Sequence, residues 1–182
     1  PSAAPASPRN DNRAGHIVEL QAPASEGGFD HTCSRMTWSV LLLAGDPGIT
    51  SSGADYGQPL ENDAFFGCPD NACFDGAGRL WITTDGSESS VGIADGLYAV
   101  ETSGPHRGRP IRLLSAPMGA EVTGPCFTPD GKALFVSIQH PGVSRGSTYA
   151  SPSSRWPDFD EGIPPRPAVV CIQRRDGGPV GG

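Results

Sequence analysis

A short stretch of the chain occurs twice, and this repeat is the feature that most limits the possible folds. Cys73 recurs 53 residues later as Cys126, together with the Phe that follows each of them and a second apolar run further on. Each copy has a short apolar segment, a turn with Asp and Gly, and a segment of β-branched and aromatic residues, which is the pattern of an antiparallel hairpin. The sequence therefore predicts equivalent hairpins over residues 68–86 and 121–139.

A repeat of about 50 residues that consists of strands and turns is typical of β-propeller blades. Further strands are expected at 96–101, 111–114 and 168–172, and an earlier, looser unit has strands at 15–20 and 37–43. We predict an all-β fold, a partial β-propeller of about two and a half blades, approximately residues 15–66, 67–118 and 119–175 of a single unit of residues 1–182. Because a propeller closes with at least about four blades, we expect the chain to be a fragment of a longer propeller.

The composition argues against several classes of partner. A net charge of −7 disfavours a nucleic-acid partner, which would require a basic surface, but it is compatible with cation binding. No apolar run reaches about 18 residues, so no membrane span is predicted. The five cysteines form no C-x-x-C pair and no zinc-binding spacing with the four histidines. Cys73 and Cys126 are interpreted as small core residues, with a disulfide as the alternative.

Two carboxylates occupy equivalent positions in successive repeats. Asp70 and Glu121 each stand at the start of an inner strand, and they are 51 residues apart. Since propeller blades are arranged radially, we expect both side chains at one end of the central axis. Carboxylates that enter one pocket repel each other unless a cation lies between them, and calcium prefers such oxygen ligands. The pattern therefore predicts a metal site, with a role as turn residues as the alternative.

Four further side chains are weaker candidates for the site. Asn71 would give a carbonyl oxygen to the metal or cap a turn, and Asp85 would face either the metal or solvent at the end of the first hairpin. His140 follows the second hairpin and is a candidate for substrate binding, with a structural hydrogen bond as the alternative. Arg13 would bind phosphate through two hydrogen bonds or form a salt bridge within its loop. No residue is assigned a catalytic role.

Several stretches resemble the C-terminal portion of the PhoX-type alkaline phosphatases, and they occur in the same order. These stretches are residues 12–19, 69–75, 80–86, 119–131 and 137–142, and residues 174–179 are similar to the C-terminal end of the family. The resemblance extends over most of residues 8–182.

This resemblance implies a six-bladed propeller with iron and calcium at its central axis, which hydrolyses small-molecule phosphate monoesters. It also implies export through the twin-arginine route, and hence a periplasmic or extracellular location. The N-terminal half of the family's propeller supplies a cysteine ligand to iron and an Arg-Pro-Glu segment, and no Arg-Pro-Glu occurs in this sequence. We therefore expect the missing N-terminal half to be the partner of this chain in the full-length enzyme, and the isolated chain to be inactive.

Two other functions agree with a partial propeller. Calcium-dependent lactonases of the gluconolactonase and regucalcin type resemble the sequence in the Pro-Asp hairpin and the axial Asp, although residues 121–125 and 139–142 favour the phosphatase. A metal-stabilised scaffold without catalytic activity is the third possibility. Assays of a phosphate ester and a lactone, with and without a chelator, would distinguish the three.

Overall fold

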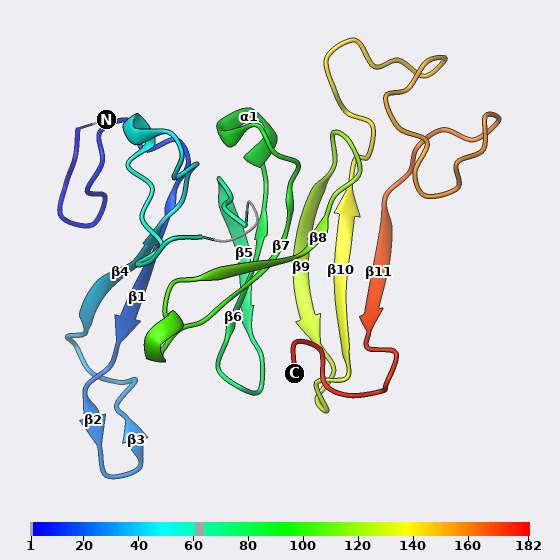
Figure 1. Cartoon of the computed structure of the whole chain (residues 1–182). Coiled ribbons are helices and arrows are strands. Elements are labelled where there is room, and N and C mark those ends of the chain that lie inside the picture. The colour runs from blue at the N-terminus through cyan, green and yellow to red at the C-terminus, as the bar shows by residue number, and fades with distance from the viewer. Residues whose placement is uncertain (1, 61–63) are drawn as a thin grey trace.

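Strands make up nearly all of the regular structure in the computed structural model, which describes residues 2–60 and 64–182 (Figure 1). Residues 61–63, inside the first predicted blade, lie outside the described residues. The strands are β1 (His16–Gln21), β2 (Ala24–Ser25), β3 (Gly28–Phe29), β4 (Thr37–Leu43), β5 (Pro69–Phe74), β6 (Leu80–Thr84), β7 (Gly96–Val100), β8 (Pro110–Ser115), β9 (Glu121–Phe127), β10 (Ala133–Gln139) and β11 (Ala168–Gln173). The helical segments are η1 (Thr50–Ser52), α1 (Ser87–Val91) and η2 (Gly104–His106). No helix among the described residues has the length and apolar character needed to cross a membrane.

Both hairpins predicted from the repeat are confirmed. β5 pairs with β6 and β9 pairs with β10, each in antiparallel orientation. Cys73 lies opposite Trp81 in the first hairpin and Cys126 lies opposite Phe135 in the second, so the two copies have equivalent registers. The single residue inserted between the repeats is therefore accommodated in the turn, and the facing positions of the strands are preserved.

Three open sheets stand side by side and give the partial propeller that the repeat predicts (Figure 1). The central sheet has the order β5-β6-β7-β8, and its neighbours are the β9-β10-β11 sheet and the β1-β4 pair; a small β2-β3 hairpin extends from the β1-β4 pair. All of these pairings are antiparallel. An antiparallel sheet can leave one face in water, but here the central sheet is covered on both faces.

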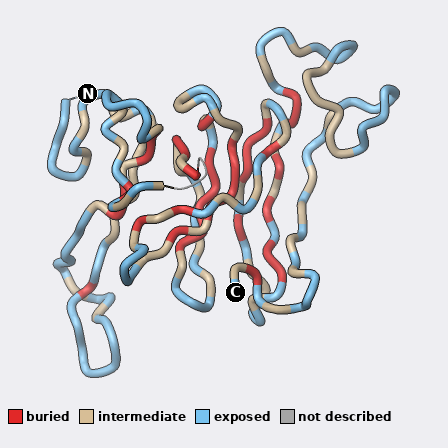
Figure 2. The backbone as a smooth tube through the Cα atoms, viewed as in Figure 1, coloured by how far each residue is buried: buried red, intermediate tan, exposed pale blue. Residues whose placement is uncertain are grey.

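The core consists of two apolar layers, one on each face of the central sheet. Alternate side chains of a strand point to opposite faces of the sheet. Every residue of β6 is buried, because both faces of the central sheet are covered (Figure 2). Leu80 and Ile82 pack in the layer shared with the β1-β4 side, whereas Trp81 packs in the layer shared with β9 and β10. The Trp81 and Phe127 rings meet edge to face with centroids 5.3 Å apart. Burial of each large apolar side chain contributes about 2 kcal/mol.

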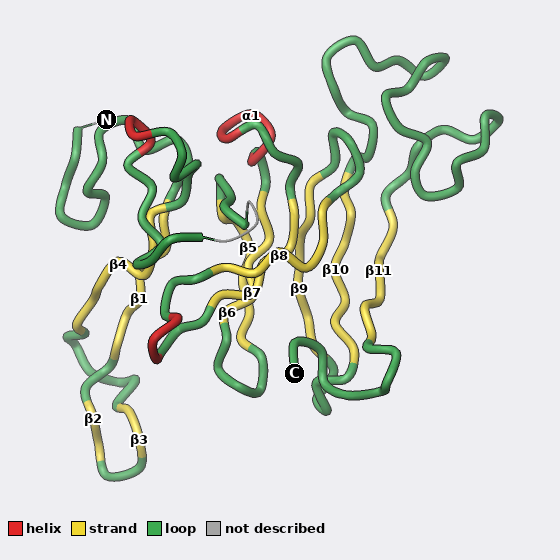
Figure 3. The backbone as a smooth tube through the Cα atoms, in the orientation of Figure 1, coloured by secondary structure: helices red, strands yellow, loops and turns green. Residues whose placement is uncertain are grey.

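Two local features differ from the sequence analysis. The segment after β6, where no regular element is predicted, forms the short helix α1 (Figure 3). The buried Asp95 carboxylate accepts hydrogen bonds from the backbone N–H groups of Gly86 at 3.0 Å and Ser87 at 2.8 Å, so it satisfies donors that a helix start leaves free. Cys126, expected in the core, is exposed, and Cys73 is partly buried; all five cysteines are free.

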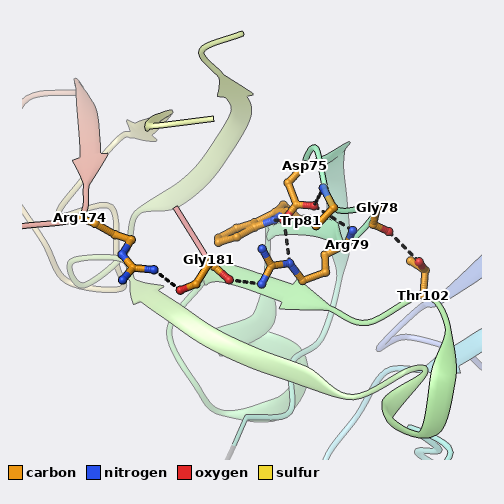
Figure 4. Close-up of polar contacts among 9 residues, drawn as sticks. Asp75, Gly78, Arg79, Trp81, Thr102, Arg174 and Gly181 are labelled. Atoms are coloured by element: carbon orange, nitrogen blue, oxygen red, sulfur yellow. Dashed lines mark hydrogen bonds and ion pairs between the residues drawn. The ribbon is translucent and has the colours of Figure 1, made fainter. Parts of the chain in front are cut away.

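The turn of the first hairpin is tied to the C-terminal segment through Asp75 (Figure 4). The Asp75 carboxylate accepts hydrogen bonds from Trp81 Nε1 at 2.9 Å and from Arg79 Nε at 2.8 Å. The Arg79 guanidinium in turn donates to the carbonyl oxygen of Gly181, and Val180 is buried in the same core layer as Trp81. Burial opposes ionisation of Asp75, but the hydrogen bonds from Trp81 and Arg79 outweigh it, so the pKa of Asp75 lies below its ordinary value.

We expect Asp75→Ala to lower the free energy of unfolding by about 2 kcal/mol, because it leaves charged and buried donors without an acceptor. The folded-state pKa lies below the unfolded one, so this stabilisation is complete above about pH 4 and is lost as the pH falls through the folded value. Urea unfolding followed by tryptophan fluorescence at several pH values measures both effects. Arg13→Ala is the control, because its exposed ion pair contributes at most about 1 kcal/mol.

Candidate functional site

The ends of two neighbouring hairpins bring four of the predicted side chains to the same edge of the fold. Asp70 lies at the start of β5 and Asp85 directly follows β6, while Glu121 begins β9 and His140 directly follows β10. In each antiparallel hairpin the first residue of one strand and the residue after the other strand come to the same end. Two carboxylates from the central sheet therefore lie beside a carboxylate and an imidazole from its neighbour.

Glu121 is the buried centre of this group, with only 8% of its surface exposed. Gln139 lies directly opposite Glu121 in the sheet, and its Nε2 donates a hydrogen bond to Glu121 Oε1 at 2.8 Å. His140 Nε2 lies 3.4 Å from Glu121 Oε2. The other ring nitrogen, Nδ1, lies 3.1 Å from the carbonyl oxygen of Gly119, which can only accept, so Nδ1 carries a hydrogen, and Nε2 donates to Glu121 only in the protonated ring. One oxygen of the Glu121 carboxylate therefore faces Gln139 and the other faces His140.

The charges around Glu121 disfavour its ionised form. Burial raises the pKa of Glu121, the charge of Asp85 raises it further, and Asp70 adds a smaller effect in the same direction. His140 opposes these effects through its hydrogen bond and charge, but the net shift is upward. The charges of Asp85 and Asp70 therefore both act on the Glu121 carboxylate.

Asn71 joins the two sheets immediately below the acidic group. Its Oδ1 accepts a hydrogen bond from the backbone N–H of Gly124 at 3.0 Å and a second from the hydroxyl of Thr123. Both donors belong to β9, whereas Asn71 belongs to β5. Asn71 therefore fixes the distance between the strands that carry Asp70 and Glu121.

Arg13 lies apart from this group. Its Nε forms an exposed ion pair with Asp11 Oδ2 at 3.0 Å, the loop salt bridge that the sequence allows as an alternative to phosphate binding. Arg13 lines a separate hollow of about 460 Å³ that also borders Ser90 and Val91 of α1. Within the described part of the chain, no hydrogen bond or ion pair joins the Arg13 side chain to Glu121 or to His140.

An open groove of about 360 Å³ borders one member of the acidic group, Asp85. Asp85, Asp95 and His140 line it from the two sheets, and Arg145 lines it from the loop that follows β10. Sequence reasoning missed Gln139 and Arg145. Gln139 could have been found from the hairpin register, since it faces Glu121, but nothing in the Ser/Pro/Gly-rich loop distinguishes Arg145.

The described residues supply part of a metal-binding set and not a complete one. Carboxylate oxygens are the ligands that calcium prefers, and the mutual repulsion of three such groups is relieved by a bound cation. Within residues 2–60 and 64–182, however, no three His, Cys, Asp or Glu side chains are grouped closely enough to hold a metal ion. The donor chemistry fits a hard cation, whereas the number of converging donors does not complete a site.

Comparisons with known proteins agree on one family. Residues 2–142 match the family described as "Alkaline phosphatase PhoX". The structure is similar to that of Pseudomonas fluorescens PhoX in complex with vanadate, a transition state analogue, with a TM-score of 0.76 and 34% sequence identity. The match covers 96% of this chain and 29% of the chain of that protein. No curated protein sequence matches the chain.

We expect Glu121→Gln to raise the thermal stability of the protein at pH 7 when divalent cations are absent. The folded-state pKa of Glu121 is raised, so ionisation costs stability as the pH rises from the unfolded value of about 4.3 through the folded one. The amide variant avoids that cost, and the difference should vanish near pH 4. Thermal unfolding followed by circular dichroism measures it, with the exposed Glu161→Gln as the matched control. A less stable Glu121→Gln variant at pH 7 would contradict the electrostatic interpretation.

Proposed function

The chain belongs to the PhoX family of alkaline phosphatases, and from this premise we propose that it takes part in the hydrolysis of phosphate monoesters. It spans 29% of the solved PhoX chain that it matches, so the activity is proposed for the full-length protein. We further propose that the three sheets correspond to blades near residues 15–66, 67–118 and 119–175. The missing ligands and blades would come from the N-terminal half of the same propeller.

The observation that carries this proposal is the position of Asp70, Asp85 and Glu121 at the same end of two neighbouring hairpins, where the charges of both aspartates oppose ionisation of the buried Glu121. A phosphate ester is an anion, and it would be repelled by such a group unless cations were bound there. We therefore propose that Asp70, Asp85 and Glu121 contribute carboxylate ligands to calcium, with iron as the second metal of the centre. When bound, such cations polarise phosphoryl oxygens and neutralise the charge that develops in the transition state.

The neighbouring residues prepare this arrangement through contacts of their own. Gln139 donates to one oxygen of Glu121, and the protonated ring of His140 would donate to the other, so the free lone pairs of the carboxylate would keep a constant direction. Asn71 acts as a positioning residue, because its oxygen already accepts two hydrogen bonds from β9. The exposed side of His140 faces the groove, where it would contact the bound ester. Arg13 lines a different hollow, so we do not assign it a contact with the ester.

Two features of the groove support a small phosphate ester as the substrate. The groove is open and about 360 Å³ in volume, which suits a small phosphate ester. Arg145 provides a cation at its rim for a phosphate oxygen. We propose a periplasmic or extracellular location, in line with the resemblance of the sequence to exported phosphatases.

We expect Asp70→Ala and Glu121→Ala to lower the rate of 4-nitrophenyl phosphate hydrolysis by the full-length protein about 100-fold or more, because each removes a charged group from the centre. A chelator should abolish the activity of the parent, and readdition of calcium and iron should restore it. Rates are compared at equal folded fraction, and a lactone serves as the counter-substrate.

Asp75→Ala is the matched control, because it also removes a carboxylate from the first hairpin but at the opposite end of the strands. This variant should lose stability and keep its turnover per folded molecule. Parental rates in Asp70→Ala and Glu121→Ala would refute the assignment of the site, and hydrolysis of the lactone alone would refute the phosphatase.

A further inference from the structure

The loop between β10 and β11 lies at the same end of the fold as Glu121 (Figure 1). It begins with His140, whose backbone adopts a left-handed conformation at φ 35°, and the N–H of Gly142 donates to the carbonyl oxygen of Met118 at 2.8 Å. Further along, the Ser153 hydroxyl donates to the carbonyl oxygen of Gly142 at 2.9 Å. The first contact attaches the start of the loop to the segment that precedes Glu121, and the second attaches the middle of the loop to its start.

Gly119 shows how closely this loop approaches. A Cβ atom at Gly119 would lie 2.3 Å from the carbonyl oxygen of Val143, which is closer than real Cβ contacts. The backbone at Gly119 also has a φ of 69°, which a glycine adopts without strain. Any larger residue at this position would push the loop away from the site. It would also change the shape of a hollow that residues of this loop line.

That hollow has a volume of about 410 Å³ and adjoins the groove that Asp85 and His140 line. Three residues line both spaces, namely His140, Val143 and Ser144. The two spaces differ in chemistry on either side of this shared wall. The acidic groove has Asp85, Asp95 and Arg145, whereas the hollow is lined by five prolines and by Tyr149.

Two of the residues that line the hollow have apolar side chains that are largely exposed to solvent. Tyr149 is 81% exposed and Val143 is 64% exposed, although the loop around them is rich in Ser, Gly and Pro. Single exposed apolar residues are common and require no explanation. These two line one hollow together with rigid proline rings, and a flat apolar group placed there would be covered on several sides.

We propose that this hollow is the subsite for the alcohol part of the substrate, and that it selects phosphate esters of aromatic alcohols. The inference rests on the proposed phosphatase function and extends it to the substrate class. The phosphoryl group would lie in the acidic groove, and the organic group would cross the wall at His140 and pack against Tyr149. Tyr149 is thus a specificity-determining residue that makes no contact with the group being transferred.

The test measures kcat/KM of the full-length protein for two esters, 4-nitrophenyl phosphate and glycerol phosphate. Tyr149→Ala should lower the value for the aromatic ester about tenfold, mainly through KM, and change the value for glycerol phosphate less than about twofold. Tyr149→Phe, which keeps the ring, should restore the aromatic preference. Inhibition by inorganic phosphate should be the same in all variants, because the phosphoryl site is unchanged.

Phe159→Ala is the matched control, since Phe159 is an aromatic residue of the same loop, is 74% exposed and does not line the hollow. It should leave both esters unaffected. Equal losses for both esters in Tyr149→Ala, or an unchanged value for 4-nitrophenyl phosphate, would overturn the subsite.

A second measurement separates failure of the subsite from failure of the phosphatase function. Binding of 4-nitrophenol, which carries no phosphate, is followed by the chemical shifts of the loop residues 140–167 in parent and Tyr149→Ala. If neither ester is hydrolysed, the phosphatase proposal fails, but binding that is lost in Tyr149→Ala still supports an aromatic subsite. Absence of binding to the parent, or equal binding to both proteins, would refute the subsite even if both esters are hydrolysed.

Discussion

The burial of both faces of the central sheet is the constraint on which the rest of the structure depends. Among the residues that the structure describes, no sheet has more than four strands, and none could bury a core by itself. Trp81 on one face and Ile82 on the other are each about 1% exposed or less, so neighbours must be present on both sides. When the sheets pack against one another, the ends of their strands come close together. These ends carry the polar residues that the apolar interior cannot hold.

This arrangement explains why the acidic group is tolerated. Glu121 is held by Gln139 and His140 in a place where burial and two further carboxylates oppose its charge. The apolar layers beneath the group supply the stability that offsets this local cost. Proteins that bind a charged ligand commonly combine unfavourable electrostatics at the site with stabilising apolar packing beside it.

The repeat predicted the hairpins because the positions of Cys73 and Cys126 fix which residues face each other. It also placed Asp70 and Glu121 at one end of the fold, since equivalent residues of stacked sheets share an end. α1 was beyond such reasoning, because the acceptor for its first N–H groups is Asp95, which follows the helix in sequence. The hollow beside Tyr149 was equally inaccessible, since it depends on how an irregular loop returns to the sheet.

The tie between Arg79 and Gly181 joins positions that are 102 residues apart in the chain. Val180 is buried in the layer that contains Trp81, so this layer is completed only when the C-terminal segment is in place. A contact of such long range carries a large entropic cost of loop closure, and it is typically formed late in folding. During synthesis the indole of Trp81 would therefore remain partly uncovered until residues 174–182 have left the ribosome, and in that interval the nascent chain exposes to solvent the largest of the side chains that the folded protein buries fully.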